Sequence, residues 1–487
     1  MKRSPTLLLA LLLFPFLLTA EEKPNVVLIM CDDLGWGDVG FNGGKKIKTP
    51  HLDAMAAESL VFTRFYAASA VCSPTRASVV TGRNPFRQGV PTANKGSLRQ
   101  EEFSIYEALK SVGYSTGHFG KWHLGTLTTK VKESNRGGPG SEAHYSPPWD
   151  HSVDTTFATE AKTPTYDPMI KPAAADKKKT GKNKDKEDKG FRTASRLGWY
   201  PVPEDSPSEP YGTHYWTGKD QMVDPDKLRG DDSKLIMDYA LPFIEEQSKA
   251  KKPFLAVIWF HAPHLPVVAG PEHTDLYPKA SGLEANYNGC VTALDEQVGR
   301  LRAELRKLGV ADNTIVTFCS DNGPEGNASA PGSASSFTGR KRSLREGGVR
   351  VPGIIEWPAK IKKGSTTDFP AVTSDYFPTL MEITGFKMPD ERPIDGESLL
   401  PVIEGKDIER AAPIGFLYGS QQSFSDNQFK IYRTNAKAPW SLFDLLADPS
   451  EKNDIAASKP EVTKSLVTQF EAWHKSVMAS EKGEDYK

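Results

Sequence analysis

Three short apolar runs, each followed at once by ionisable side chains, constrain the fold of this chain most strongly. The runs are residues 25–30, 254–260 and 314–319. Continuous apolar runs of this length are typical of strands buried on both faces of a sheet. Helical patterns lie between them, for example 287–308, with apolar residues at helical spacing. Together they predict an α/β fold: a large mixed, mostly parallel sheet covered by helices on both faces.

The polar residues that follow these runs predict where a site would lie. Ligands in open α/β sheets bind beyond the carboxyl ends of the strands. Three separate segments therefore direct polar groups to one edge of the sheet. These groups are Asp32 and Asp33 after the first run, His261 and His264 after the second, and Asp321 and Asn322 after the third.

Composition excludes some classes of partner. The 487 residues include 61 Lys and Arg and 62 Asp and Glu, so the overall charge favours neither nucleic acid nor an acidic membrane surface. Residues 1–20 combine two basic residues, an apolar stretch and a small-residue end, which is typical of a secretory signal peptide. We therefore expect an exported protein, periplasmic or secreted, that does not span a membrane.

The rest of the chain divides unevenly. We predict a main domain over 21–393 and a small α+β domain over 394–487, with strands at 429–433 and 441–445 and a helix at 460–478. Residues 126–230 show no clear pattern, and residues 173–190 are rich in lysine. Composition favours a solvated, mobile insertion there. A basic arm that touches a polyanionic substrate is the alternative.

The segment CSPTRASVVTGR, residues 72–83, is the most informative stretch. Pro74 suits the first turn of a helix and Gly82 suits its end, which places Cys72 at a helix N-terminus that favours anions. A free thiol capping a helix would fit the same pattern. The other cysteines are Cys31, Cys290 and Cys319, and the sequence leaves open whether Cys290 and Cys319 form a disulfide.

This segment resembles the signature of the type I, formylglycine-dependent sulfatases of the alkaline phosphatase superfamily, which include arylsulfatases and N-acetylgalactosamine-6-sulfatase-like bacterial enzymes. The resemblance implies that Cys72 is oxidised to formylglycine (3-oxoalanine) by a formylglycine-generating or sulfatase-maturating enzyme. It also implies an alkaline-phosphatase-like fold. Arg76, one turn after Cys72, is carried over as a catalytic residue.

The acidic pairs predict a metal site. Adjacent acids at a strand end are costly unless a positive charge joins them, although such residues also form turns. Oxygen ligands suit Ca²⁺ or Mg²⁺ rather than zinc. By resemblance, one divalent cation, Ca²⁺ in preference to Mg²⁺, is held by Asp32, Asp33, Asp321, Asn322 and the modified Cys72. We expect no organic cofactor.

Three further motifs resemble the anion-binding segments of the family. They are GKWHLG at 120–125, FHAPHLP at 260–266 and GRKRSLREGGVRVP at 339–352. The resemblance implies catalytic roles for Lys121, His123, His264 and Lys341. It also implies that Lys121, His264, Lys341 and His261 bind the substrate.

The sequence thus predicts an exported sulfatase that hydrolyses a sulfated carbohydrate. Aromatic residues around the insertion (Trp149, Trp199 and Trp216) favour a sugar, because aromatic faces stack on sugar rings. The alternatives are a phosphonate or phosphate monoester hydrolase of the same superfamily and an inactive glycan-binding relative.

Overall fold

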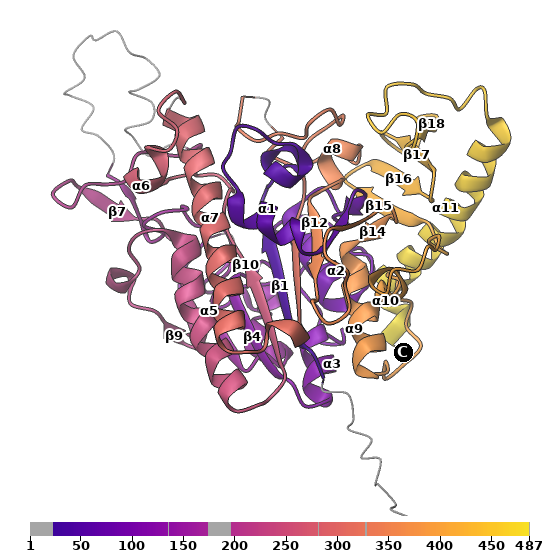
Figure 1. Ribbon diagram of the computed structural model, residues 1–487. Helices are drawn as coiled ribbons and strands as arrows, with labels where there is room; N and C mark the ends of the chain where they lie inside the picture. The colour runs from indigo at the N-terminus through magenta and orange to yellow at the C-terminus, as the bar shows by residue number, and fades with distance from the viewer. Residues whose placement is uncertain (1–22, 135, 174–195, 281, 327–328, 487) are drawn as a thin grey trace, which may run out of the picture.

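A ten-stranded sheet forms the centre of the fold (Figure 1). The computed structural model describes residues 23–134, 136–173, 196–280, 282–326 and 329–486. The strands lie in the order β13 (Ser365–Thr367), β2 (Leu60–Phe62), β12 (Gly353–Glu356), β11 (Thr314–Ser320), β1 (Asn25–Cys31), β10 (Phe254–Trp259), β4 (Ser115–Lys121), β5 (Thr155–Thr159), β8 (Trp216–Gly218) and β9 (Gln221–Met222).

The middle of this sheet is parallel, as predicted. Strands β11, β1, β10, β4 and β5 all run in one direction. The three apolar runs of the sequence form the adjacent strands β11, β1 and β10, with Cys31 opposite Ser320 and Met30 opposite Trp259. Because these strands end together, the polar residues that follow them emerge at the same edge.

Helices cover both faces of the sheet. Alternate residues of β1 point to opposite faces, and they are apolar, so each face needs a helical layer to bury it. Val27 and Ile29 share one apolar cluster with α1 (Pro50–Ala57), α5 (Asp232–Lys249) and α7 (Gly282–Lys307). Val26 and Leu28 share the other cluster with α2 (Cys72–Thr81), α3 (Ile105–Ser111) and α9 (Tyr376–Thr384). The predicted fold class is confirmed.

The segment from 126 to 230 differs from the solvated insertion expected from its composition. Strands β5, β8 and β9 belong to it, and they extend the main sheet. Strands β6 (Ile170–Pro172) and β7 (Ser208–Pro210) form a separate ribbon. Trp199 and Trp216 are buried, and Trp149 packs partly buried against the core, so these indoles do not form the exposed stacking surface suggested by the sequence. Within the lysine-rich tract, the positions from 174 onward lie outside the described residues.

The C-terminal part contains a small antiparallel sheet, which confirms the predicted α+β character. Its strands are β15 (Ile414–Tyr418), β16 (Gln421–Ser425), β17 (Phe429–Arg433) and β18 (Ser441–Asp444). Helix α11 (Pro460–Glu481) packs on it through Leu466, Phe470 and Val477. The remaining elements are α6 (Pro271–Thr274), α8 (Glu346–Val349), α10 (Leu400–Ile403) and the pair β3 (Phe65–Tyr66) and β14 (Ala371–Val372).

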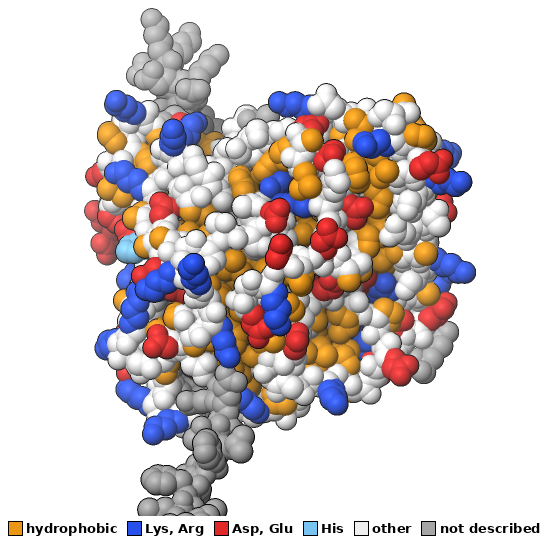
Figure 2. Space-filling model, turned by 45° about the vertical axis from the view of Figure 1, so that its right-hand side comes forward, with side chains coloured by type: hydrophobic (Ala, Val, Ile, Leu, Met, Phe, Trp, Pro, Cys, Tyr) orange, Lys and Arg blue, Asp and Glu red, His pale blue; other side chains and the backbone are white. Residues whose placement is uncertain are grey.

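Positive and negative side chains are interspersed over the face seen in Figure 2. No helix in the described ranges is both long and apolar enough to cross a lipid bilayer. The predicted signal peptide, residues 1–20, lies outside the described residues. All four cysteines carry free thiols, so Cys290 and Cys319 do not form a disulfide here.

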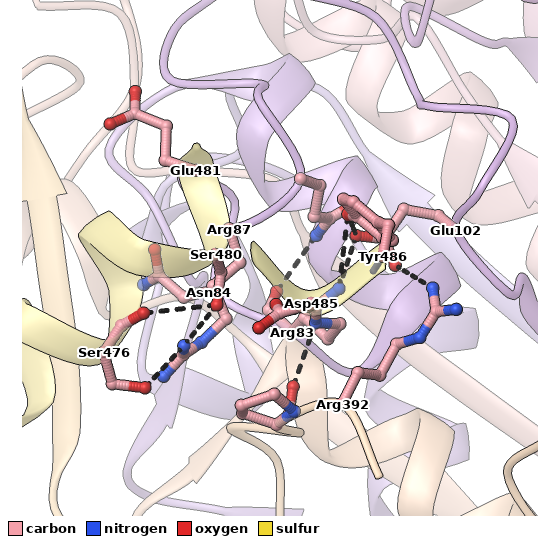
Figure 3. A network of polar contacts seen from close by, with 12 residues as sticks. Arg83, Asn84, Arg87, Glu102, Arg392, Ser476, Ser480, Glu481, Asp485 and Tyr486 are labelled. Atoms are coloured by element: carbon pink, nitrogen blue, oxygen red, sulfur yellow. Dashed lines mark hydrogen bonds and ion pairs between the residues drawn. The ribbon is translucent and has the colours of Figure 1, made fainter. Parts of the chain in front are cut away.

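Residues 476–486 form hydrogen bonds and ion pairs with the segment that follows α2 (Figure 3). The buried Arg83 donates from Nη1 to Glu102 Oε1 at 2.6 Å and pairs with Asp485. Tyr486 donates its hydroxyl to Glu102 as well. Four residues further along the chain, Arg87 donates to the hydroxyl oxygens of two α11 serines, Ser476 and Ser480. We name this set of contacts the C-terminal clasp.

We expect the substitution Arg83→Met to destabilise the protein by about 3 kcal/mol, because it leaves the buried carboxylate of Glu102 without its nearest cation. Urea unfolding measures this change. The matched control is Arg306→Met, since Arg306 pairs with Glu58 at the surface, where ion pairs contribute about 1 kcal/mol or less. Equal effects of the two substitutions would contradict a structural role for the clasp.

Candidate active site

Four buried polar residues meet where β1 and β11 end. Asp32 and Asp33 follow β1, while Asp321 and Asn322 follow β11, and none is more than 1% exposed. The Asp33 amide donates to Asp321 Oδ1 at 3.2 Å. The Asn322 side chain donates to Asp33 Oδ1 at 2.7 Å. The structure therefore brings together the four residues that the sequence proposed as metal ligands.

Three oxygens of this group are buried without a hydrogen-bond donor: Asp32 Oδ1, Asp33 Oδ2 and Asn322 Oδ1. Leaving a buried acceptor unpaired is costly, so such atoms in one place point to a missing positive partner. Burial, and then the charge of Asp32, raises the pKa of Asp321 to about 7. A hard divalent cation would satisfy the free oxygens and reduce this repulsion, so the residues present fit the predicted ion.

Cys72 lies beside these acids at the first position of α2. The helix begins after Val71, which is extended, and ends at Gly82, whose φ of 71° is a left-handed conformation that suits glycine. The Cys72 Sγ and a carboxylate oxygen from each of Asp32 and Asp321 lie within 4.8 Å of one another. The side chain is 2% exposed, and burial raises the pKa of its thiol.

Arg76, one turn along α2, faces the carboxylates. Its Nη2 lies 2.7 Å from Asp321 Oδ2 and 3.4 Å from Asp32 Oδ2. Its guanidinium packs over the Trp259 ring, 5.1 Å from the centroid. Arg76 is fully buried. The geometry therefore favours a role in holding the acids over direct contact with a substrate.

Two lysines reach the acids from other segments. Lys121, the last residue of β4, places Nζ 2.6 Å from Asp32 Oδ2. Lys341 places Nζ 2.5 Å from Asp33 Oδ1. The neighbouring arginines point elsewhere, since Arg342 pairs with Glu325 and Arg345 with Glu451. The structure thus brings both lysines into contact with the acids of the cluster.

His123 and His264 both border the cluster as neutral rings. His123 Nε2 lies 2.8 Å from Asn94 Oδ1, and its buried Nδ1 has no hydrogen-bond partner. Burial, followed by the charge of Lys121, lowers the pKa of His123. His264 Nε2 lies 3.7 Å from Asp33 Oδ2. Burial also lowers the pKa of His264.

His261 does not have the substrate-binding position that the sequence suggested. Its Nδ1 lies 2.8 Å from Asp232 Oδ2, and its Nε2 lies 2.8 Å from Thr159 Oγ1. The ring is fully buried, so neither nitrogen is available to a ligand. His261 instead anchors the segment that carries His264.

Comparison with known proteins gives the family. A family model described as sulfatase matches residues 24–386. The chain belongs to the sulfatase family. A second family model, described as the C-terminal part of N-sulphoglucosamine sulphohydrolase, matches residues 337–476 of this sulfatase. The predicted family and the enzyme class, a sulfuric ester hydrolase, are confirmed.

Named relatives of this sulfatase span most of its length. N-acetylgalactosamine-6-sulfatase of Rattus norvegicus is 31% identical over 442 residues, which are 87% of this chain and 74% of the relative. Ulvan-active sulfatase of Formosa agariphila is 28% identical over 493 residues, 96% of this chain and 83% of the relative. The crystal structure of Ps i-CgsB in complex with k-i-k-neocarrahexaose has a TM-score of 0.72 at 27% identity and covers 93% of both chains.

Several residues around the site of this sulfatase were not found from the sequence. Asp232 lies 29 residues before His261, which it orients. Asn94 lies 29 residues before His123. Lys162 approaches from the segment after β5. None belongs to a recognisable motif, so only the folded chain shows that they lie near the site.

Proposed function

We propose that this sulfatase is an exported enzyme that removes sulfate from a sulfated carbohydrate, with a formylglycine hydrate made from Cys72 beside one divalent cation. The main support is that Cys72 Sγ and carboxylate oxygens of Asp32 and Asp321 lie within 4.8 Å of one another. Lys121 and Lys341 contribute positive charge at the same place. A sulfate ester is an anion, so a nucleophile needs such cations to approach it.

The unmodified thiol is a poor nucleophile in this environment. Burial raises its pKa, so little thiolate exists at neutral pH. Oxidation by a formylglycine-generating or sulfatase-maturating enzyme would replace the thiol with an aldehyde that adds water. One hydroxyl of the hydrate attacks sulfur, loses its proton, and breaks the S–O bond to the substrate's alcohol, which leaves with a proton. The second then loses its proton, which expels sulfate and restores the aldehyde, so one hard hydrolysis becomes two easier steps.

Asp32, Asp33, Asp321, Asn322 and the modified Cys72 would hold the cation, with Ca²⁺ preferred over Mg²⁺. The bound ion polarises an oxygen ligand and offsets negative charge. Support comes from the three donor-free oxygens at the cluster and from the all-oxygen character of their groups. Ca²⁺ accepts flexible coordination by carboxylates and amide oxygens, whereas Mg²⁺ usually retains several waters.

Lys121 and Lys341 would bind the sulfate oxygens. Each ammonium has three hydrogens, and its ion pair with an aspartate leaves others free for a substrate. Arg76 keeps Asp32 and Asp321 in place. All three cations also stabilise the charge that develops in the transition state.

The two histidines differ in the proton transfers that they can make. The neutral His123, with Nδ1 unpaired, can accept the proton of the second hydroxyl. His264 Nδ1 lies 2.6 Å from the Leu265 carbonyl oxygen, which only accepts, so this nitrogen carries the hydrogen. Nε2 can then donate to the leaving alcohol only from the imidazolium form, which burial disfavours by lowering the pKa of His264. The Lys341 ammonium, beside the same acids, is the second possible donor.

The carbohydrate substrate is supported by the relatives. Two of them are named for action on N-acetylgalactosamine 6-sulfate or ulvan, and a third is seen with a neocarrahexaose. Export is supported by the residue pattern of positions 1–20 alone. The inactive glycan-binding alternative would need a missing nucleophile or ligand, whereas Cys72, Asp32, Asp33, Asp321 and Asn322 are all present.

Sulfate release from a panel of defined sulfated oligosaccharides tests the proposal. The panel includes a steroid sulfate and a matched pair of aryl sulfate and aryl phosphate. We expect release from at least one oligosaccharide, and an aryl sulfate rate at least about 100-fold above the phosphate rate, because the one extra negative charge of an ionised phosphate monoester alters the match to the cations. Activity on the steroid sulfate alone would refute the carbohydrate. Faster phosphate hydrolysis would favour the phosphatase alternative.

A further inference from the structure

Lys162 lies at the same sheet edge as the active site. Strand β5 runs parallel to β4, with Thr159 opposite Lys121 in register. Beyond β5, the Thr159 hydroxyl donates to the Ala161 carbonyl at 2.6 Å and also lies 2.8 Å from His261 Nε2. These contacts fix the backbone immediately before Lys162. The backbone that carries the Lys162 side chain is therefore held in place beside the end of β4.

The ammonium of Lys162 has no carboxylate partner in the described part of the chain. Lys121 and Lys341, by contrast, each contact an aspartate. Burial lowers the pKa of Lys162, and the charges of Lys121 and Lys341 lower it further. The charge of Lys162 in turn contributes to the lowered pKa of His264. Lys162 is thus a partly buried cation close enough to affect the cluster electrostatically.

The charges at the site are unevenly matched. Asp32, Asp33 and Asp321 balance the three cations Arg76, Lys121 and Lys341. A divalent ion adds two positive charges, and a sulfate ester offsets only one of them. Lys162 increases the remaining positive charge. A desolvated cation without a partner is unfavourable, and an anion placed beside it would remove that cost.

We propose that Lys162 binds a second anionic group on the sugar that carries the scissile sulfate, either a carboxylate or a further sulfate. The inference rests on the proposed function and names a narrower substrate class: sugars with two negative charges close together. Lys162 then acts as a specificity residue. It comes from the segment between 126 and 230, outside the motifs on which the resemblance was based.

Ligand binding to the Cys72→Ala protein, with Ca²⁺ present, tests this directly. Isothermal calorimetry compares monosulfated sugars with the same sugars bearing a second sulfate or linked to a uronic acid. We expect at least one dianionic ligand to bind about 10-fold to 100-fold more tightly than its monosulfated counterpart, since a charge-assisted hydrogen bond contributes that much. The sulfate and carboxylate ligands separate the two sources of charge.

Lys162→Gln in the same background should abolish the preference, and Lys162→Arg should restore most of it. The matched control is Lys132→Gln, an exposed lysine of the same segment, which should keep the preference. Equal loss of affinity for monosulfated and dianionic ligands, or no preference in the parent protein, would overturn the inference. Hydrolysis of monosulfated sugars by the wild-type enzyme tests the proposed function separately.

Discussion

Sulfate release by the Cys72→Ala variant should fall by at least about 10⁴-fold, while the protein keeps its fold. Loss of a catalytic nucleophile has effects of this size or larger. Alanine fits the first position of α2, and the neighbouring acids and lysines would remain in place. Assay of sulfate release, together with circular dichroism and thermal unfolding, measures both outcomes. Ala77→Gly, in the same helix but in the apolar core, is a control for effects of altering α2.

The Cys72→Ser variant separates the hydrate mechanism from a simple hydroxyl nucleophile. A serine has one hydroxyl, so after attack it would hold the sulfate ester and could not expel it. We expect at most one turnover and a mass increase of one sulfo group on the peptide that contains residue 72. Repeated turnover by this variant, or an intact thiol at position 72 in fully active protein, would disprove the formylglycine mechanism.

The Asp32→Asn variant should lose the bound cation, and its activity should fall by at least about 100-fold. The substitution keeps the size of the side chain but removes a charge that faces Lys121, Arg76 and the donor-free oxygens. A readout without turnover is available, because a ligand that binds only the folded protein stabilises it by about 2.7 kcal/mol at 100 times its dissociation constant.

We therefore expect saturating Ca²⁺ to raise the melting temperature of the chelator-treated wild type and to leave that of Asp32→Asn unchanged. Asp38→Asn is the matched control, since the Asp38 carboxylate accepts hydrogen bonds from Gly35 and Tyr287 and is not among the proposed ligands. A normal calcium response in Asp32→Asn would remove Asp32 from the ligand set.

The centre of the sheet could be predicted because its strands can be recognised from their own residues, without knowledge of the rest of the fold. Strands β1, β10 and β11 are continuous apolar runs, and their pairing follows from burial on both faces. Strand β5, Thr155–Thr159, has no such run, and β8 is three residues long. The sheet position of these strands depends on tertiary contacts, so their segment looked like a solvated insertion.

The same distinction holds in the site. Asp32, Asp33, Asp321 and Asn322 follow recognisable strands, so the sequence could predict that they meet. His261 and His264 lie in one motif, and their spacing could not show which ring has both nitrogens hydrogen-bonded inside the protein. Asp232 and Thr159 decide that, and they come from α5 and β5. Lys162 could not be found either, because its proposed role depends on its having no carboxylate partner among the described residues, and only the folded chain shows that.

The C-terminal clasp has a consequence for the order of events in the cell. It joins Tyr486 to Glu102, so it cannot form until the chain has been synthesised as far as Tyr486. In the folded chain Cys72 is 2% exposed, so another protein cannot surround its side chain. If the cysteine is oxidised as proposed, the maturing enzyme must act while the polypeptide is still open, and closure then seals the product inside.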